Sequence, residues 1–190
     1  MASSDSKIDN NFYTELFTKS APVILVVFAV AVWNLWFVKQ ILPIEWAPPI
    51  VFSLASLKTI MIIRVTFHQL SKIILQSHIL THVVVLFALL IGLIIFSFAS
   101  DFTAFYLINE NAFQANPSIL NNSTLSIFFD CMYFSTVTFS AIGYGDIVPS
   151  NGWVKALIML EVILYFFVLV FGIANINGIK IDEKKHDSKS

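Results

Sequence analysis

Charged residues are scarce in this chain: Asp, Glu, Lys and Arg make up 12% of its 190 residues, whereas 57% are hydrophobic. Together with a mean hydropathy of +0.81, this excludes an ordinary soluble domain and predicts a protein built into a membrane. The formal net charge of −1 gives no reason to expect a nucleic-acid partner. The single cysteine, Cys131, excludes an intrachain disulfide.

A catalytic constellation is also missing. An intramembrane enzyme needs a nucleophile with a base, or a metal cluster. The residues of suitable chemistry are Asp130, Cys131, Glu161, His68, His78 and His82. Their spacing matches no such arrangement, so we expect no enzymatic activity and no organic cofactor.

Four long apolar segments predict four transmembrane helices, since about 20 residues are needed to cross the hydrocarbon. They cover residues 21–42, 50–67, 82–108 and 153–179. Pro43, Pro48 and Pro49 are expected to interrupt the helical chain between the first two spans. The third span is longer than needed, and we expect its outer end to emerge near Asp101.

The second span is the least apolar, because it contains Lys58 and Arg64. Each cation costs roughly 2.5–3.5 kcal/mol at a helix centre, so we expect both side chains to snorkel toward the surface. Two cations fall short of the roughly 3–4 charges that voltage sensors carry, and strong voltage gating is not expected. Residues 69–80 then form a short amphipathic stretch, which is either an interfacial helix or a cuff that joins the second span to the pore.

The distribution of basic residues predicts the orientation. The connection after the second span contains Lys72, and lysines recur in the tail at positions 180, 184, 185 and 189. The connection before the last span is acidic and has no Lys or Arg before Lys155. Basic segments stay on the cytoplasmic side, so both termini are predicted to be cytoplasmic, with the protein in the plasma membrane.

Residues 141–146, which precede the last span, read Ala-Ile-Gly-Tyr-Gly-Asp. Gly143 and Gly145 accept positive φ without steric cost, which lets consecutive carbonyl groups point the same way. Residues 123–141 predict a short helix that enters the membrane from outside, with Ser123 or Thr124 as its N-cap. The partial negative charge at its C-terminal end would favour a cation there.

This segment resembles the selectivity filter of potassium channels, whose signature is Thr-Val-Gly-Tyr-Gly-Asp. The resemblance covers about residues 83–179 and is typical of a small prokaryotic-type channel, here with two extra N-terminal membrane helices. It implies an all-α membrane protein of four transmembrane helices, a re-entrant pore helix and a filter loop. Within it, residues 1–20 and 180–190 are tails, residues 21–80 hold the first two helices, and residues 81–179 form the pore domain.

The resemblance also implies the ligand and the partners. Potassium ions would be bound by the main-chain carbonyls of Ala141, Ile142, Gly143 and Tyr144, with Gly145 completing the strand. The motif occurs once and the chain shows no internal duplication, so a ring of carbonyls requires a homotetramer in the bilayer, with three further copies of this chain. A separate regulatory subunit remains an open alternative.

Residues around the filter acquire supporting roles from the same resemblance. Tyr133 is implied to hydrogen-bond Asp146, while Thr138 and Ser140 are implied to pack behind the filter. For Glu161 we favour a hydrogen bond to the pore helix. The alternatives are a cation-concentrating ring in the cavity, or pairing with Lys58 or Arg64.

Two further positions in the last span are candidates for a hinge or gate. The family often has a hinge glycine where this chain has Tyr165, and Gly172 follows two turns later. Gly172 is either a displaced hinge or a site of close helix packing. Asn175 either lines the cytoplasmic mouth or marks the water boundary.

Ala141 departs from the family pattern, which has threonine at this position. The substitution removes hydroxyl groups from the innermost ion site and keeps the carbonyls, so we expect weaker ion occupancy there and retained potassium preference. The alternatives for function are a weakly selective monovalent cation channel and an accessory subunit of a hetero-oligomeric channel.

Overall fold

The computed structural model describes residues 21–22, 24–34, 43, 45–76, 80–115 and 123–187. A helical segment, Ile24–Asn34, comes first. The elements that follow are α3 (Ala47–Gln76), α4 (Leu80–Ile108), the 3₁₀ helix η1 (Glu110–Ala112), β1 (Phe113–Ala115), α5 (Thr124–Phe139), β2 (Ile147–Pro149) and α6 (Gly152–Asp187). The described chain is therefore mostly helical, as predicted, with two short strands that were not predicted.

Three helices in the described residues are long and apolar enough to cross a membrane: Ala47–Arg64, Phe87–Ile108 and Gly152–Val170. They lie within the predicted second, third and fourth spans or overlap them closely. The first predicted span is helical over residues 24–34, but residues 35–42 lie outside the described part of the chain. A fourth span therefore stays a prediction.

The boundaries of α3 differ from those expected. Pro48 and Pro49 lie in its first turn, where helical N–H groups have no intrahelical partner and proline is tolerated. The chain is non-helical at Pro43, Glu45 and Trp46, where the expected interruption is present, but Pro48 and Pro49 begin the next helix instead of preceding it. The amphipathic stretch at residues 69–80 is, as far as Gln76, the continuation of α3.

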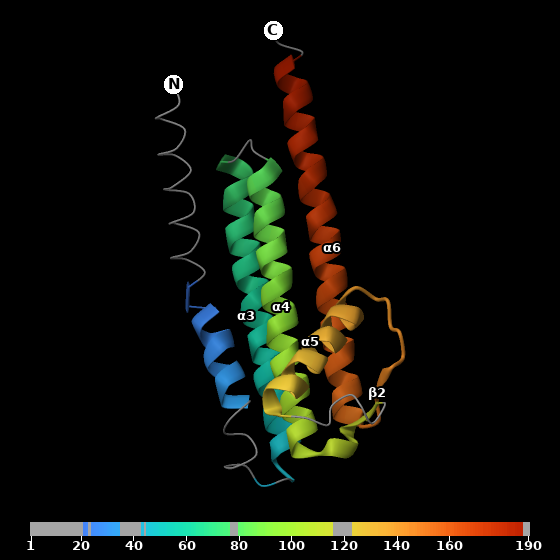
Figure 1. Ribbon diagram of the computed structural model, residues 1–190. Coiled ribbons are helices and arrows are strands. Elements are labelled where there is room, and N and C mark those ends of the chain that lie inside the picture. The colour runs from blue at the N-terminus through green and yellow to red at the C-terminus, as the bar shows by residue number, and fades with distance from the viewer. Residues whose placement is uncertain are drawn as a thin grey trace.

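Helices α3 and α4 run side by side, with α6 alongside them and the shorter α5 tilted across the region between α4 and α6 (Figure 1). The packing of α4 is most extensive against α5, and α3 contacts both α4 and α6. The C-terminal ends of α3 and α6 and the start of α4 lie at one end of the molecule, and the strands lie at the other (Figure 1).

The two strands form a small antiparallel sheet in which Phe113 is opposite Pro149 and Ala115 is opposite Ile147. Next to it, the N–H group of Ser150 donates to the carbonyl of Ala112 at 2.9 Å. Strands of three residues leave no readable alternation in a sequence. This sheet ties the chain that leaves α4 to the chain that enters α6.

An aromatic cluster fixes α5 against this frame. The rings of Phe102, Phe113 and Phe134 meet edge to face in all three pairings, with centroids 5.0, 5.6 and 6.1 Å apart. Pairs of this kind contribute about 0.5–1.5 kcal/mol each beyond burial. Because lipid is as apolar as the side chains, close packing of this sort, more than exclusion of water, positions helices in a membrane.

Candidate functional site

Helix α5 enters the molecule from the end that carries the sheet and stops part-way along α4 and α6 (Figure 1). Its N-cap is Ser123, whose hydroxyl accepts from the N–H group of Ser126 at 3.5 Å. Beyond its last residue, Phe139, the chain turns back toward the same end and reaches β2 (Figure 1). The helix thus forms where a short re-entrant helix was predicted.

The backbone after α5 alternates in handedness. The φ angles of Ala141, Gly143 and Gly145 are +56°, +57° and +78°, so every second residue is left-handed. Alternation of this kind gathers successive N–H groups on one side of the chain and leaves the carbonyls toward the other. The N–H groups of Ile142 and Gly143 donate back to the carbonyl of Val137, at 3.1 and 3.4 Å.

The carbonyl groups of this segment are left without protein donors. Within the described part of the chain, no hydrogen bond ends on the carbonyl oxygens of residues 141–145. All residues from 140 to 146 are exposed, including the large apolar side chain of Ile142 at 56% and the ring of Tyr144 at 67%. The segment is therefore a row of carbonyl groups that accept no hydrogen bond in the described chain and that belong to exposed residues.

Ala141 was not expected to share the left-handed conformation of the glycines. A left-handed residue that carries a β-carbon costs roughly 1–2 kcal/mol. Alanine has the smallest side chain that bears this cost, and a β-branched residue would be less favourable still. Two of the three left-handed residues are therefore glycines, which the sequence identifies. The third, Ala141, is left-handed because of its place in the alternating backbone.

The hydrogen bond predicted between Tyr133 and Asp146 is present, with the phenol donating to Oδ2 at 2.7 Å. The other oxygen of Asp146 accepts from the N–H group of Ile147 at 3.1 Å. The bond to Asp146 raises the pKa of Tyr133, so the phenol remains a neutral donor. Together these bonds join the outer end of the 141–145 segment to α5.

Glu161 lies fully buried on α6 and accepts a hydrogen bond from the hydroxyl of Ser135 on α5, at 2.5 Å. The same hydroxyl lies 3.2 Å from the carbonyl of Ile95 on α4, so three helices meet at one serine. The favoured interpretation, a bond to the pore helix, matches this geometry. Pairing of Glu161 with Lys58 is wrong, because Lys58 pairs with Asp101.

The other predicted side chains are arranged as follows. Ser140 is exposed and its hydroxyl donates to the carbonyl of Thr136 at 2.7 Å, while Thr138 is half-buried. A β-carbon on Gly172 would lie 3.4 Å from the ring of Phe87, a geometry that favours close packing of α6 on α4. The side chain of Asn175 lies outside the described residues.

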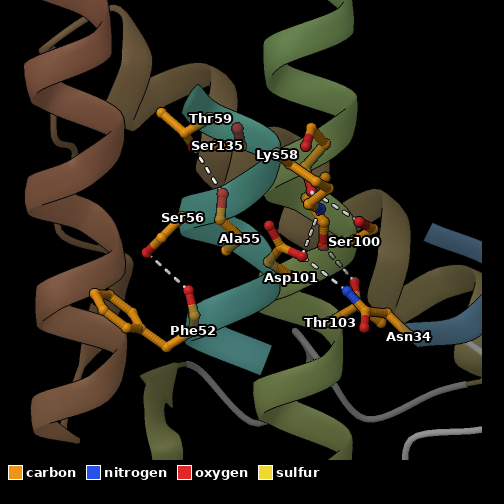
Figure 2. A network of polar contacts seen from close by, with 12 residues as sticks. Asn34, Phe52, Ala55, Ser56, Lys58, Thr59, Ser100, Asp101, Thr103 and Ser135 are labelled. Carbon is orange, nitrogen blue, oxygen red and sulfur yellow. Dashed lines mark hydrogen bonds and ion pairs between the residues drawn. The ribbon is translucent and has the colours of Figure 1, made fainter. Parts of the chain in front are cut away.

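A polar cluster that was not predicted lies inside the helical frame (Figure 2). Lys58 Nζ is 2.7 Å from Asp101 Oδ1, and both side chains are almost fully buried, at 2% and 1% exposure. Asn34 donates to the same carboxylate oxygen at 2.7 Å, and Lys58 also approaches the carbonyl of Ser97 at 3.4 Å. One expectation is therefore wrong, because Lys58 does not snorkel. Helix α4 ends at Ile108, as predicted for the third span, and the emergence of its outer end from the membrane near Asp101 stays a prediction.

This cluster has an electrostatic consequence. A membrane potential of 100 mV supplies about 2.3 kcal/mol per transferred charge, whereas leaving one partner of a buried pair alone costs roughly 3–5 kcal/mol. The field therefore does not separate Lys58 from Asp101. Opposite charges on neighbouring spans were the one signal in the sequence that could have pointed to the pair; nothing comparable pointed to Ser135.

Comparisons with known proteins place this geometry in context. A family model described as "Ion channel" matches residues 83–181, slightly more than half of the chain. The matched range nearly coincides with the part of the sequence that resembles potassium channels. The resemblance is thereby confirmed.

Three curated relatives are potassium channels by name. The chain is 29% identical over 69 residues to "Potassium channel protein kcv" of Paramecium bursaria Chlorella virus 1, covering 36% of this chain and 73% of that protein. It is 54% identical over 37 residues to "Two-pore potassium channel 4" of Arabidopsis thaliana, covering 20% and 13%.

The third relative is the "Hyperpolarization-activated voltage-gated potassium channel" of Methanocaldococcus jannaschii, 36% identical over 55 residues, covering 29% of this chain and 23% of that protein. The chain thus spans well under half the length of two of these three relatives. No solved structure matches the chain significantly.

Proposed function

This chain belongs to the ion channel family, and we propose that it forms a potassium-selective channel as one of four identical subunits. The observation that carries the proposal is the row of left-handed residues Ala141, Gly143 and Gly145, whose neighbouring carbonyls accept no hydrogen bond within the described chain. The potassium channels among its relatives support the choice of ion.

Conduction would be passive. Carbonyl oxygens of Ala141, Ile142, Gly143 and Tyr144 would replace the water around a potassium ion, with Gly145 completing the strand. The C-terminal end of α5, which immediately precedes these residues, presents a partial negative charge toward the entering cation. Binding at several adjacent levels lets neighbouring ions repel one another, so that each ion can leave as well as enter.

A single chain cannot complete this site. One copy offers one carbonyl at each level, and unpaired backbone groups are tolerated at membrane depth only where protein buries them or water fills the cavity. We infer that three further copies surround the pore, each contributing its own 141–145 segment.

Uncovered apolar faces on α5 and α6 support this assembly. Exposed side chains recur three to four residues apart, at Leu125, Phe129 and Tyr133 on α5 and at Met159, Ile163, Phe166 and Val170 on α6. The opposite face of α6 is buried against the rest of the chain, for example at Leu157 and Leu164. Neighbouring subunits and the pore itself would take up the exposed faces.

Topology follows from the same arrangement. The C-terminal ends of α3 and α6 lie on one side of the molecule (Figure 1). Lysines occur near both ends, at Lys72 in α3 and at Lys180, Lys184 and Lys185 in α6. We assign this side to the cytoplasm, both termini included, of a plasma membrane, with residues 21–42 as a fourth membrane helix.

A weakly selective cation channel is the second candidate, favoured specifically by Ala141, which offers no hydroxyl at the innermost site. The reversal potential of the purified chain in planar bilayers, with potassium and sodium on opposite sides, separates the two candidates. A reversal potential near the potassium equilibrium value supports the first, and one near zero supports the second.

The mass of the purified particle in lipid nanodiscs tests the stoichiometry in parallel. A tetramer of this chain that conducts potassium supports the proposal. A stable monomer that conducts only when another pore-forming chain is added would identify an accessory subunit instead.

A further inference from the structure

A buried polar joint links the N-terminal helices to the proposed pore. It consists of Asn34 from the segment Ile24–Asn34, Lys58 from α3 and Asp101 from α4, and each side chain is at most 2% exposed. Both Lys58 and Asn34 donate to the same oxygen of Asp101, at 2.7 Å each (Figure 2). Three elements therefore meet at one carboxylate oxygen.

The same stretch of α4 also holds the pore helix. Ile95 accepts from Ser135 of α5 at 3.2 Å, and Phe102 meets Phe134 of α5 edge to face at 5.0 Å. Residues 95–102 of α4 thus lie between α5 on one side and the joint on the other. A shift of α4 relative to α3 would move the helix that carries the 141–145 segment.

The buried ion pair between α3 and α4 indicates a role beyond holding the two helices together. A well-packed apolar pair in place of a buried ion pair is often equally stable or more so, because no charge has to be desolvated. Apolar surfaces can slide over one another, whereas Lys58, Asp101 and Asn34 meet in only one register of the three elements. The membrane field is also too weak to separate the charges.

We propose that the Asn34–Lys58–Asp101 joint braces α4 against α5 and thereby sets the opening equilibrium of the pore, with the N-terminal helices acting as a fixed support. This inference rests on the proposed channel function. It assigns a regulatory role to side chains that contact neither the ion nor the 141–145 segment.

Single-channel recordings in planar bilayers, combined with melting of the purified tetramer, test the proposal. Lys58→Met and Asp101→Leu singly leave an uncompensated buried group and lower the melting temperature. The double variant Lys58→Met/Asp101→Leu restores the melting temperature, since no buried charge remains. Its open probability nevertheless differs from that of the parent by about threefold or more, at unchanged potassium-to-sodium selectivity.

The exchange Lys58→Asp/Asp101→Lys, which keeps an ion pair, is expected to return the open probability toward the parent value. Thr59→Val is the matched control: Thr59 is buried beside Lys58, but its hydroxyl donates to Ala55 within α3 and bridges no elements. It should leave opening unchanged.

Parental opening in the stable apolar double variant would overturn the proposal, as would an equal change caused by Thr59→Val. A parent chain that conducts without potassium selectivity, while the double variant still alters opening, would overturn the proposed ion selectivity and leave the joint intact. A parent that conducts no ions overturns both.

Discussion

The 141–145 segment, called the filter segment after its proposed function, and the Asn34–Lys58–Asp101 joint both place polar groups among the helices, but in different ways. The filter segment uses backbone carbonyls, is exposed throughout, and its carbonyls accept no hydrogen bond in the described chain. The joint uses side chains, is buried, and finds its ion pair and a further hydrogen bond within one chain.

The two regions differ in how far their polar groups are paired. At the joint Lys58 and Asp101 pair within one chain, although Asn34 Oδ1 is buried there without a partner in the described residues, whereas none of the carbonyls of residues 141–145 accepts a bond. Polar groups that meet their partners inside one chain stabilise its fold, and they cannot also bind a passing ion. Polar groups left free in a single chain are tolerated only where other copies, water or an ion cover them. The carbonyl groups of the 141–145 segment, which accept no hydrogen bond in the described chain, thus support its proposed role in binding ions.

The largest effect is expected where the backbone alternation is broken. Gly143→Ser places a β-carbon on a residue with a φ of +57°, which destabilises the native backbone conformation by about 1 kcal/mol per subunit. Over four subunits this corresponds to a loss of potassium flux on the order of a thousandfold. Flux from liposomes with sodium as competitor measures it.

Gly92→Ser is the matched control, because Gly92 lies within α4 at an ordinary helical φ and a β-carbon there meets no atom within 4 Å. It should retain flux close to that of the parent. Equal loss in the two variants would mean that serine disturbs folding generally, and full flux in Gly143→Ser would place the pore elsewhere.

An intermediate effect is expected where a buried side-chain contact lies behind the filter segment. Ser135→Ala removes the hydroxyl that joins Glu161 to α5 and leaves a buried carboxyl oxygen without its donor. Hydrogen bonds between membrane helices contribute about 0.6–2 kcal/mol, so the tetramer should melt several degrees lower. Thermal melting in detergent measures this.

Ser53→Ala provides the comparison, since Ser53 donates only to Pro49 within its own helix and is exposed. Its melting temperature should equal that of the parent. If Ser135→Ala melts like the parent too, the contact with Glu161 does not hold α5 and α6 together.

A smaller effect is expected from Tyr133→Phe, which removes the bond to Asp146 at the exposed outer end of the segment. Loss of one charge-assisted bond in water-accessible surroundings should change single-channel conductance or open time about two- to fivefold. Because the pKa of Tyr133 is raised above the ordinary tyrosine value of 10.0, the phenol stays protonated at every pH below 10.0. The hydrogen bond to Asp146 is lost only as the pH rises through this raised pKa.

The ratio between parent and Tyr133→Phe should therefore stay constant across neutral pH. Tyr165→Phe is a suitable control, because the Tyr165 ring packs on Phe139 at 5.3 Å and this contact survives loss of the hydroxyl. A conductance change of the same size in the control would show that the Tyr133 bond has no particular role.

The smallest effect is expected at Ala141. Ala141→Gly relieves a left-handed residue and should raise tetramer stability by up to about 1 kcal/mol, with flux within about twofold of the parent. Ala156→Gly, within α6, should have the opposite sign, since glycine destabilises a regular helix by a similar amount. Denaturant or thermal melting measures the stability of both variants. Equal destabilisation by Ala141→Gly and Ala156→Gly would show that Ala141 is not strained.

Much of the site could be predicted from local sequence. Gly143, Gly145 and the helix capped by Ser123 are consequences of residues close together in the chain. Ala141 could not be assigned a left-handed conformation in this way, because nothing in an alanine calls for one; its φ follows from its place in the alternation. The sheet of β1 and β2 could not be predicted either, because each strand has only three residues and shows no alternation of apolar and polar residues.

The sequence by itself determined which segments are apolar, where the short helix α5 lies and where glycine permits carbonyls to turn, because hydropathy and backbone freedom belong to each residue and its near neighbours. Only the tertiary structure decided that Asp101 is the partner of Lys58, 43 residues away, and of Asn34, 67 residues away. Such contacts depend on the register in which helices pack, and a buried charge takes the partner that this register brings within reach.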